Sequence, residues 1–386
     1  MPSLSSQPND HLTVIASFLD GLDLKRCMRV SKRLAVFARK QWPATSTILD
    51  RALEEASRYS HQLSDVFPHV RVGITRVTRQ DLISTCTNLV ARNGGPHLRD
   101  VTFTIDNVND VRNATGLFQL CPDIETLVLV NSHLDDTTRF GLISLLRRLK
   151  KLNLTRNRQL GPSSAAAIAL QSDLRSLILT ECSVSDHSVA LIVQVCESLE
   201  ELHLERCYAI GIETLTQLSH AKNLRVLDLA HCQGVYDSHI KALARGCQAL
   251  QTLVVSYCMR LVDLRCLASL PHLKALDVSN TSVSIASIQA VGPMLNHLNI
   301  NGCIALTGME CLKGANLETL EAMFLELSDS DLMVLGEMPK LKLLDVRRTG
   351  VSKQGFDALH EAFPHIELIT TFNTSLYEWK PKAARA

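Results

Sequence analysis

Two short stretches of the chain carry residue types that do chemistry in enzymes. Residues 185–187 read Ser-Asp-His, the side chains of a hydrolase triad. Residues 201–205 read Glu-Leu-His-Leu-Glu, which on a strand would turn three metal-binding side chains to one face. Adjacency in sequence does not give triad geometry, and no further spacing supports the metal site. We therefore expect no catalytic residue and no metal, and we expect Asp186 to cap a helix.

The twelve cysteines form no CxxC pair, and nothing resembles a phosphate loop or a GxGxxG turn. We predict no cofactor and no enzyme activity. The N-terminal MPSLSSQPNDH lacks the features of a signal peptide, and the apolar stretches are far shorter than the roughly 18 residues that span a bilayer. Reduced thiols, a cytoplasmic or nuclear location and no membrane contact are the expectation.

Charge is balanced, with 40 Lys plus Arg against 39 Asp plus Glu. This balance excludes recruitment by bulk charge to nucleic acid or to an anionic membrane. Hydrophobic residues make up 46% of the chain, which excludes a wholly disordered protein. Composition therefore favours a folded protein with a large core.

One frame recurs along the chain: apolar residues at positions 0, 3 and 5, then Cys, Asn, Thr or Ser at position 8. Eleven copies follow at intervals of 22 to 26 residues, the first two looser than the rest. They start at Leu98, Ile124, Leu149, Leu174, Leu199, Leu224, Leu250, Leu273, Leu295, Leu317 and Leu341.

This is the leucine-rich-repeat pattern, in which a short strand, a turn and a helical return form one unit. No unit can bury its apolar face alone, so neighbours stack and share a core. We predict an α/β solenoid with a curved parallel sheet and outer helices. Position 8 should hold buried structural thiols, with three further cysteines closing helices before a frame. These are Cys182, Cys207, Cys232, Cys258 and Cys303, and Cys121, Cys196 and Cys247. Cysteine at position 8 resembles a subclass of these repeats that is frequent in F-box proteins.

Residues 8–44 lie outside the repeat and predict three short helices. Asp10 is placed to cap the first and Asp23 the second, and Pro43 stops the third. Such a small unit encloses little core, so it must lean on the solenoid or on a partner. Its basic residues are interleaved with an apolar stripe, which favours a solvated helix face over a nucleic-acid arm.

The spacing of Pro8, Ile15, Phe18-Leu19-Asp20, Asp23-Leu24 and Val30-Ser31-Lys32-Arg33 resembles an F-box. With the repeats, the architecture is similar to the F-box/leucine-rich-repeat family, whose members are substrate receptors of SCF ubiquitin ligases. The resemblance implies that an adaptor subunit, itself attached to a cullin, contacts a defined set of residues. That set is Pro8, Leu12, Ile15, Leu19, Leu24, Val30, Ser31 and Leu34.

Two positions of this segment depart from the family pattern. Gln7 stands where a leucine usually precedes the proline, and Leu34 stands where a tryptophan commonly follows VSKR. Aromatic anchors often dominate interface energy. Two alternatives therefore stay open: the segment binds an adaptor, or it only caps the solenoid.

The register of the frame also predicts the residues that face a partner. Position 4 should be exposed on the strand face, and its acids, such as Asp228 and Asp277, suggest a partner of basic character. Position 7 supplies aromatic and arginine side chains, the types that make most hot spots. From it we predict that substrate contacts Arg156, Arg206, His231, Tyr257, Phe324 and Arg348.

These observations divide the chain into an F-box-like segment at 8–44, a linker and degenerate repeat at 45–97, eleven repeats at 98–365, and a cap and tail at 366–386. The predicted function is a protein-interaction module that brings a substrate to an SCF-type ubiquitin ligase. The alternative is a non-catalytic scaffold subunit of a large assembly.

Overall fold

A computed structural model describes residues 71–74, 100–103, 108–132 and 134–369 of the chain. The F-box-like segment, the linker apart from its first strand, and the tail after residue 369 lie outside these residues. The chain divides into two compact units, Met1–Cys182 and Ser183–Ala386. Among the described residues, no helix has the length and apolarity needed to cross a membrane.

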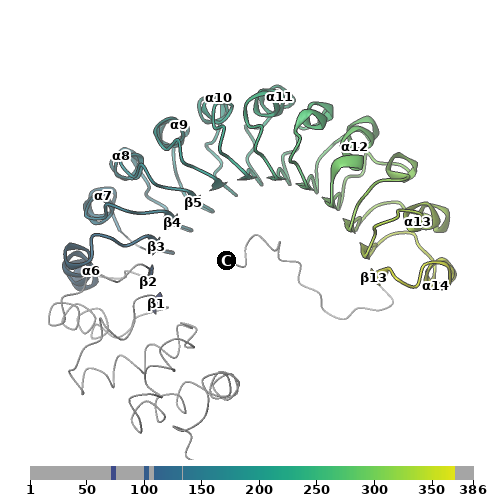
Figure 1. Ribbon diagram of the computed structural model, residues 1–386, viewed down its shortest axis with the longest axis horizontal. Helices are drawn as coiled ribbons and strands as arrows, with labels where there is room; N and C mark the ends of the chain where they lie inside the picture. Colours follow the sequence, from purple (N-terminus) through teal and green to yellow (C-terminus); the bar gives the residue numbers. More distant parts are fainter. Residues whose placement is uncertain (1–70, 75–99, 104–107, 133, 370–386) are drawn as a thin grey trace, which may run out of the picture. The chain divides into compact units, whose positions relative to one another are not determined.

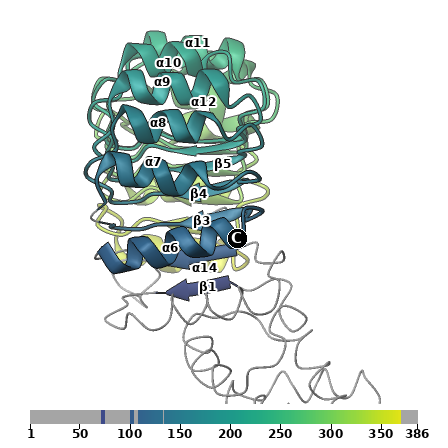
Figure 2. The ribbon, with the colours of Figure 1, turned by 90° about the vertical axis from the view of Figure 1, so that its left-hand side faces the viewer.

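The first unit stacks parallel strands in chain order, with a helical return between most neighbours (Figure 2). Its helices α6 to α8 lie one above another on one side of the strands. The strands are β1 (Arg71–Ile74), β2 (Asp100–Phe103), β3 (Thr126–Val128), β4 (Lys151–Asn153) and β5 (Ser176–Ile178). The helices are α6 (Val108–Leu120), α7 (Asp136–Ser144) and α8 (Pro162–Ala169).

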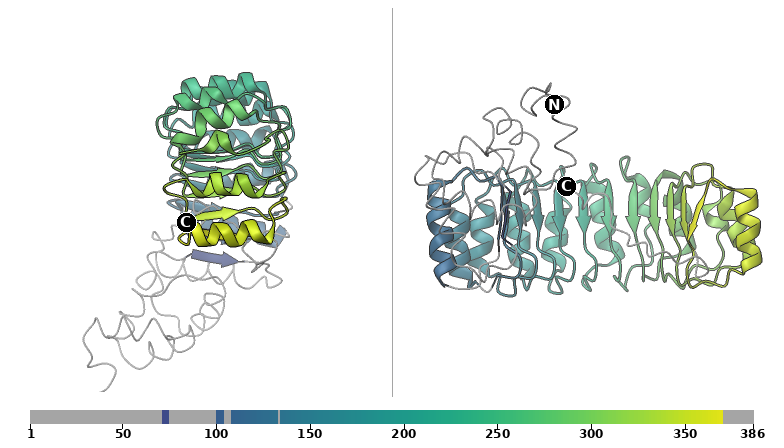
Figure 3. Two further views of the ribbon diagram at one scale, coloured as in Figure 1. Left: turned by 90° about the vertical axis from the view of Figure 1, so that its right-hand side faces the viewer. Right: turned by 90° about the horizontal axis from the view of Figure 1, so that it is seen from below.

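The second unit continues the same frame, with its strands on the inner side and its helices on the outer side (Figures 1 and 3). The strands are β6 (Glu201–His203), β7 (Val226–Asp228), β8 (Thr252–Val254), β9 (Ala275–Asp277), β10 (His297–Asn299), β11 (Thr319–Glu321), β12 (Leu343–Asp345) and β13 (Glu367–Ile369). The helices are α9 (Asp186–Val195), α10 (Ile212–Leu218), α11 (Asp237–Gly246), α12 (Ile285–Val291), α13 (Asp329–Gly336) and α14 (Lys353–Ala362).

Three short 3₁₀ helices lie in the described part of the second unit: η2 (Arg265–Ser269), η3 (Gly292–Met294) and η4 (Glu310–Leu312). In the repeats that start at Leu250 and Leu295, of 23 and 22 residues, η2 and η4 stand in place of an α-helix, whereas the 22-residue repeat from Leu273 has α12 followed by η3. Cys266 and Cys311 lie in η2 and η4 and are half-buried. The tighter 3₁₀ turn is the usual way to fit such a short piece.

The core of each unit is a ladder of leucines held in register by the strands. Leu227 pairs with Leu253, Leu253 with Leu276, and Leu276 with Leu298. The side chains at positions 0, 3 and 5 are almost fully buried throughout. Each buried leucine contributes about 2 kcal/mol relative to an exposed one. The protein is therefore a leucine-rich-repeat solenoid, as the frame predicted.

Burial of the cysteines follows the prediction as well. All five at position 8 are buried, and so are the three that precede a frame. Cys196 and Cys247 are the C-terminal caps of α9 and α11. The Sγ atom of Cys258 donates to the carbonyl oxygen of Leu229 at 3.2 Å, so the thiol satisfies a turn carbonyl of the preceding repeat.

Acidic residues at the first position of a helix join consecutive repeats, a role that the sequence analysis missed. We predicted that Asp186 caps its own helix, but Ser185 is the N-cap of α9. The Asp186 carboxylate instead accepts hydrogen bonds from the N–H groups of Gly211, Glu213 and Thr214 in the next repeat, at 2.9, 3.0 and 3.1 Å. It satisfies donors at the start of α10, which begins without a side-chain cap of its own.

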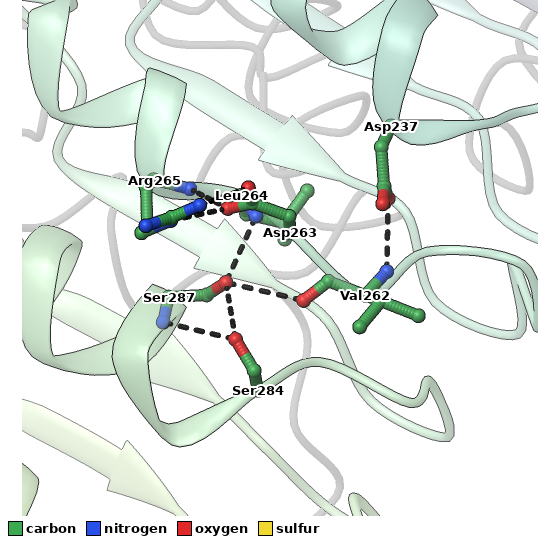
Figure 4. A network of polar contacts seen from close by, with 7 residues as sticks. All are labelled: Asp237, Val262, Asp263, Leu264, Arg265, Ser284 and Ser287. Carbon is green, nitrogen blue, oxygen red and sulfur yellow. Dashed lines mark hydrogen bonds and ion pairs between the residues drawn. The ribbon is translucent and has the colours of Figure 1, made fainter.

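Figure 4 shows a related network between the repeats around η2. The Asp237 carboxylate accepts from the Val262 N–H at 2.9 Å. The Ser287 hydroxyl accepts from the Leu264 N–H at 2.9 Å and donates to the Val262 carbonyl at 3.1 Å. The strand-to-helix loops are thus fixed by side chains of adjacent repeats, which gives the inner face a rigid edge.

Candidate interaction surface

Position 7 of each described repeat has a backbone in the left-handed region. Tyr257 has φ of 58°, Phe324 has 59° and Arg348 has 58°. Only glycine and, to a lesser degree, asparagine adopt this region readily, and other residues incur roughly 1 kcal/mol or more. We call this set the left-handed row: Asn131, Arg156 and Glu181 in the first unit, and Arg206, His231, Tyr257, Asn280, Gly302, Phe324 and Arg348 in the second.

All six predicted substrate-contact residues belong to the left-handed row, and none of them is buried. Arg156, Tyr257, Phe324 and Arg348 are exposed, and Arg206 and His231 are half-buried. The prediction that position 7 faces solvent is confirmed. Their contact with a substrate stays a prediction.

In the first unit, Arg156 is paired within the row. Its Nε lies 3.0 Å from Oε2 of Glu181, and its Nη2 lies 3.4 Å from Oε1, a two-point contact between exposed side chains. Such a surface pair contributes little to stability. It does fix the direction of the guanidinium and offsets its charge.

In the second unit, the row brings its aromatic and cationic side chains together in two groups. The rings of His231 and Tyr257 stack with centroids 4.1 Å apart and planes 10° apart. The guanidinium of Arg348 lies 5.3 Å from the centre of the Phe324 ring. Burial, and next the charge of Arg206, lower the pKa of His231, so the imidazole stacks on Tyr257 in its neutral form near pH 7.

The strand face at position 4 differs from the prediction. We expected these side chains to be exposed, but Asp277, Asn299, Glu321 and Asp345 are only 9%, 9%, 6% and 4% exposed. Those at position 4 of the earlier repeats are half-buried. The alternation rule gave the correct face, but it did not account for side chains that bind their own backbone.

Short polar side chains at position 4 accept hydrogen bonds from the N–H two residues further on. Asp228 accepts from Ala230 at 2.9 Å, and Asp277 accepts from Ser279 at 2.8 Å. Asn153, Asn299 and Asp345 do the same. This Asx geometry satisfies the turn that leads into position 7. These acids therefore have a structural role besides any contact with a partner.

Asp277 and Glu321 are buried carboxylates bound by amides rather than by cations. Asn299 donates to Oδ2 of Asp277 at 3.2 Å, and Asn301 donates to Oε2 of Glu321 at 3.1 Å. Burial raises the pKa of Asp277 and raises the pKa of Glu321 to about 7. Both groups have a high free energy when ionised, which a nearby cation would lower.

Asp345 is different because it is neutralised within the chain. The guanidinium of Arg347 contacts both carboxylate oxygens, with Nη2 2.7 Å from Oδ2 and Nε 3.0 Å from Oδ1. Asp228 has a weaker partner, Nδ1 of His203 at 3.6 Å.

Exposed apolar side chains lie beside the left-handed row, at position 9, and the sequence analysis did not select them. Tyr208, Met259 and Ile304 are 66%, 54% and 84% exposed. Each stands directly after the buried cysteine at position 8. The sequence signal was an apolar residue at position 9, directly after a buried residue. A loop residue at that place cannot also enter the core, so its side chain stays exposed.

The two stretches with chemical residue types serve structural contacts. Ser185 caps α9, and Nδ1 of His187 lies 3.0 Å from Oε2 of Glu213 in the next repeat. His203 faces Asp228. Within the described ranges, no group of three or more His, Cys, Asp and Glu side chains could hold a metal ion. The adaptor-facing residues from Pro8 to Leu34 lie outside those ranges.

No family model matches the chain, and no curated protein sequence matches it. Solved structures do. An internalin from Listeria monocytogenes is 16% identical with a TM-score of 0.54, covering 97% of this chain and 100% of its own. Rad7, from the Rad7–Elc1 complex in yeast, is 17% identical with a TM-score of 0.58, covering 96% and 98%. At these identities the likeness shows the fold, a leucine-rich-repeat solenoid.

Proposed function

We propose that the chain is the substrate-recognition subunit of an SCF-type ubiquitin ligase. Residues 8–44 bind the adaptor, and the inner face of the repeats binds a protein substrate. The left-handed row supports substrate binding. Its backbone conformation favours glycine, yet most of its positions hold bulky side chains, and strained backbone of this kind is typical of functional sites. The F-box-like spacing carries the adaptor half. The similar fold of Rad7, solved in complex with Elc1, is consistent with a solenoid that binds a second subunit.

In this proposal the chain itself does no bond chemistry. The adaptor holds one end, and the inner face holds the substrate, so lysines of the substrate are kept near the subunits that transfer ubiquitin. Holding two reactants together raises their effective concentration to the millimolar range or above.

Affinity purification followed by mass spectrometry tests both halves. The native chain should recover an adaptor and a cullin together with candidate substrates. A Leu19→Asp, Leu24→Asp variant should lose adaptor and cullin. A Tyr257→Ala, Phe324→Ala variant should keep them and lose the substrates. If the native chain recovers stable stoichiometric partners but neither adaptor nor cullin, the chain is a scaffold subunit instead.

A further inference from the structure

The inner face of the second unit carries an aromatic border along its exposed edge. Tyr257 and Phe324 are 38% and 50% exposed, and their ring positions are fixed by the left-handed backbone and by stacking on His231 and Arg348. Met259, two residues after Tyr257, is 54% exposed as well. Rigid aromatic side chains along an open face provide contact area at little entropic cost.

The strand face beside this border is acidic. In the five repeats that begin at Leu224 to Leu317, positions 2, 4 and 6 hold three carboxylates and no lysine or arginine. The carboxylates belong to Asp228, Asp277 and Glu321, on β7, β9 and β11. We call these three the acidic rungs. Their negative charge favours a cationic partner. Because these carboxylates are partly removed from water, the local dielectric constant is low and the attraction is stronger.

The spacing of the acidic rungs constrains the shape of the partner. Strands in one sheet lie about 4.8 Å apart, so rungs on every second strand repeat at about 9.6 Å. A polyproline II chain has three residues per turn and rises about 3.1 Å per residue, so every third side chain returns to the same side after about 9.3 Å. A β-strand does not fit, because its third neighbour points to the opposite face.

We propose that the partner of this face is a basic polyproline II segment that runs across the strands. Lysine or arginine at every third residue lies over Glu321, Asp277 and Asp228, and the residues between them rest on Tyr257 and Phe324. This proposal names the class of segment that the substrate presents. It rests on the proposed function, because only that function makes the bound protein a substrate. Aromatic side chains are a common surface for such segments, which lose little entropy on binding.

The protonation of Glu321 adds a consequence of this contact. Around its carboxylate lie the Asn301 amide, the carboxylates of Asp277 and Asp345, and the Arg347 guanidinium. A bound lysine favours the ionised form, so the segment should bind more tightly at pH 8 than at pH 6.

Fluorescence anisotropy with the purified full-length chain tests the proposal. The probe is a labelled peptide of three lysine-proline-alanine triplets, and the control peptide has the same composition with the lysines adjacent. We expect the triplet peptide to bind about tenfold more tightly, which is about 1.4 kcal/mol. Asp277→Asn with Glu321→Gln should remove that advantage, and Tyr257→Ala should weaken binding of both peptides. Glu310→Gln with Asp357→Asn, which removes two exposed acids in η4 and α14, should change nothing.

Three results would overturn the proposal. They are equal affinity for both peptides, no loss in the Asp277 and Glu321 variant, or a large gain when Lys382→Glu and Arg385→Glu are introduced. The last result would make the chain's own basic tail the occupant in place of a partner. Because the assay contains no adaptor, its failure leaves adaptor capture unaffected, and failure of adaptor capture leaves the peptide result valid. Circular dichroism of each variant controls for folding.

Discussion

The two units share one repeat frame but differ at position 8, which holds Ser132, Asn157 and Cys182 in the described repeats of the first unit and mainly cysteine or threonine in the second. In the first unit, Asn157 occupies this position and donates to the carbonyls of Leu129 and Leu154 at 2.7 and 2.6 Å. Its Oδ1 accepts from the hydroxyl of Ser132 and, at 3.3 Å, from the fully buried guanidinium of Arg139. In the second unit, cysteines at position 8 donate to the same kind of carbonyl.

Arg139 shows how far this difference extends. It is the fourth residue of α7, a position held by Ala165, Val189, Leu215 and Ile240 in other helices. Its Nη2 donates to the Leu134 carbonyl at 2.8 Å, and its Nη1 donates to the Gln159 carbonyl. Its Nε is the buried side-chain atom without a partner in the described part of the chain. The fourth helix position of the frame therefore accepts either an apolar residue or a hydrogen-bonded cation. The frame requires that buried polar groups are hydrogen-bonded, and it is less strict about the residue type.

The largest effect should come from removing the amide of the first unit. Asn157→Leu removes the side-chain donor to the Leu129 and Leu154 carbonyls and the acceptor of the Ser132 hydroxyl, and it takes one of two acceptors from Nη2 of Arg139. Breaking such a network destabilises by about 3–5 kcal/mol. Urea denaturation, followed by far-ultraviolet circular dichroism, measures the change in the free energy of unfolding. Asn131→Gly, at an exposed left-handed position, is the matched control and should change stability by less than about 0.5 kcal/mol. A loss below about 1 kcal/mol would contradict the role assigned to the network.

A double substitution sharpens the comparison by converting one chemistry into the other. Arg139→Ile and Asn157→Cys should each destabilise alone. Together they should cost about 1–3 kcal/mol less than the sum of the two, because the cysteine does not need the guanidinium and the isoleucine matches the other helices. A double-mutant cycle by denaturation measures this coupling. Additive effects would mean that the two residues act independently.

Buried charge in the second unit gives a pH-dependent test. Burial raises the folded-state pKa of Glu321 to about 7, above the 4.5 that is usual for glutamate, so the folded protein binds this proton more tightly than the unfolded chain. The resulting stability is present below about pH 4.5 and is lost as pH rises through about 7.

Glu321→Gln keeps an acceptor for Asn301 and removes this dependence. We expect the variant to match the native protein near pH 5 and to exceed it by about 1–2 kcal/mol at pH 8. Thermal denaturation across that range measures the difference. Asp357→Asn on α14 is the exposed control. A native-like pH profile for Glu321→Gln would show that other groups set it.

The smallest effect concerns the thiols. Burial raises the pKa of Cys247 and Cys258 to about 12, so little reactive thiolate forms at pH 8. Iodoacetamide under native conditions should modify the half-buried Cys266 and Cys311 first, and the cysteines at position 8 only after unfolding. Mass spectrometry of tryptic peptides gives the order. Early modification of Cys232 would mean that the cysteines at position 8 are open to solvent.

The frame predicted the fold, the burial at position 8 and the exposure at position 7, because each follows from packing that repeats in every unit. Position 4 was predicted wrongly, since Asp277 and Asp228 turn toward their own backbone and local bonding of that kind carries no periodic signal. Asp186 was misplaced for a similar reason. A carboxylate at a helix start looks like a cap for that helix, and only the structure reveals that the next helix receives it. Arg139 in the core had no sequence signal, because an arginine on a helix is ordinarily solvated.

The left-handed row has a consequence for how the protein can change. Its backbone is fixed by the repeat on either side, whichever side chain it carries, and the chain already places Arg, Glu, His, Tyr, Asn, Gly and Phe there. A substitution in this row alters the outward surface without disturbing the leucine ladder. If the row binds the proposed substrate, its specificity can therefore change one residue at a time at nearly constant stability.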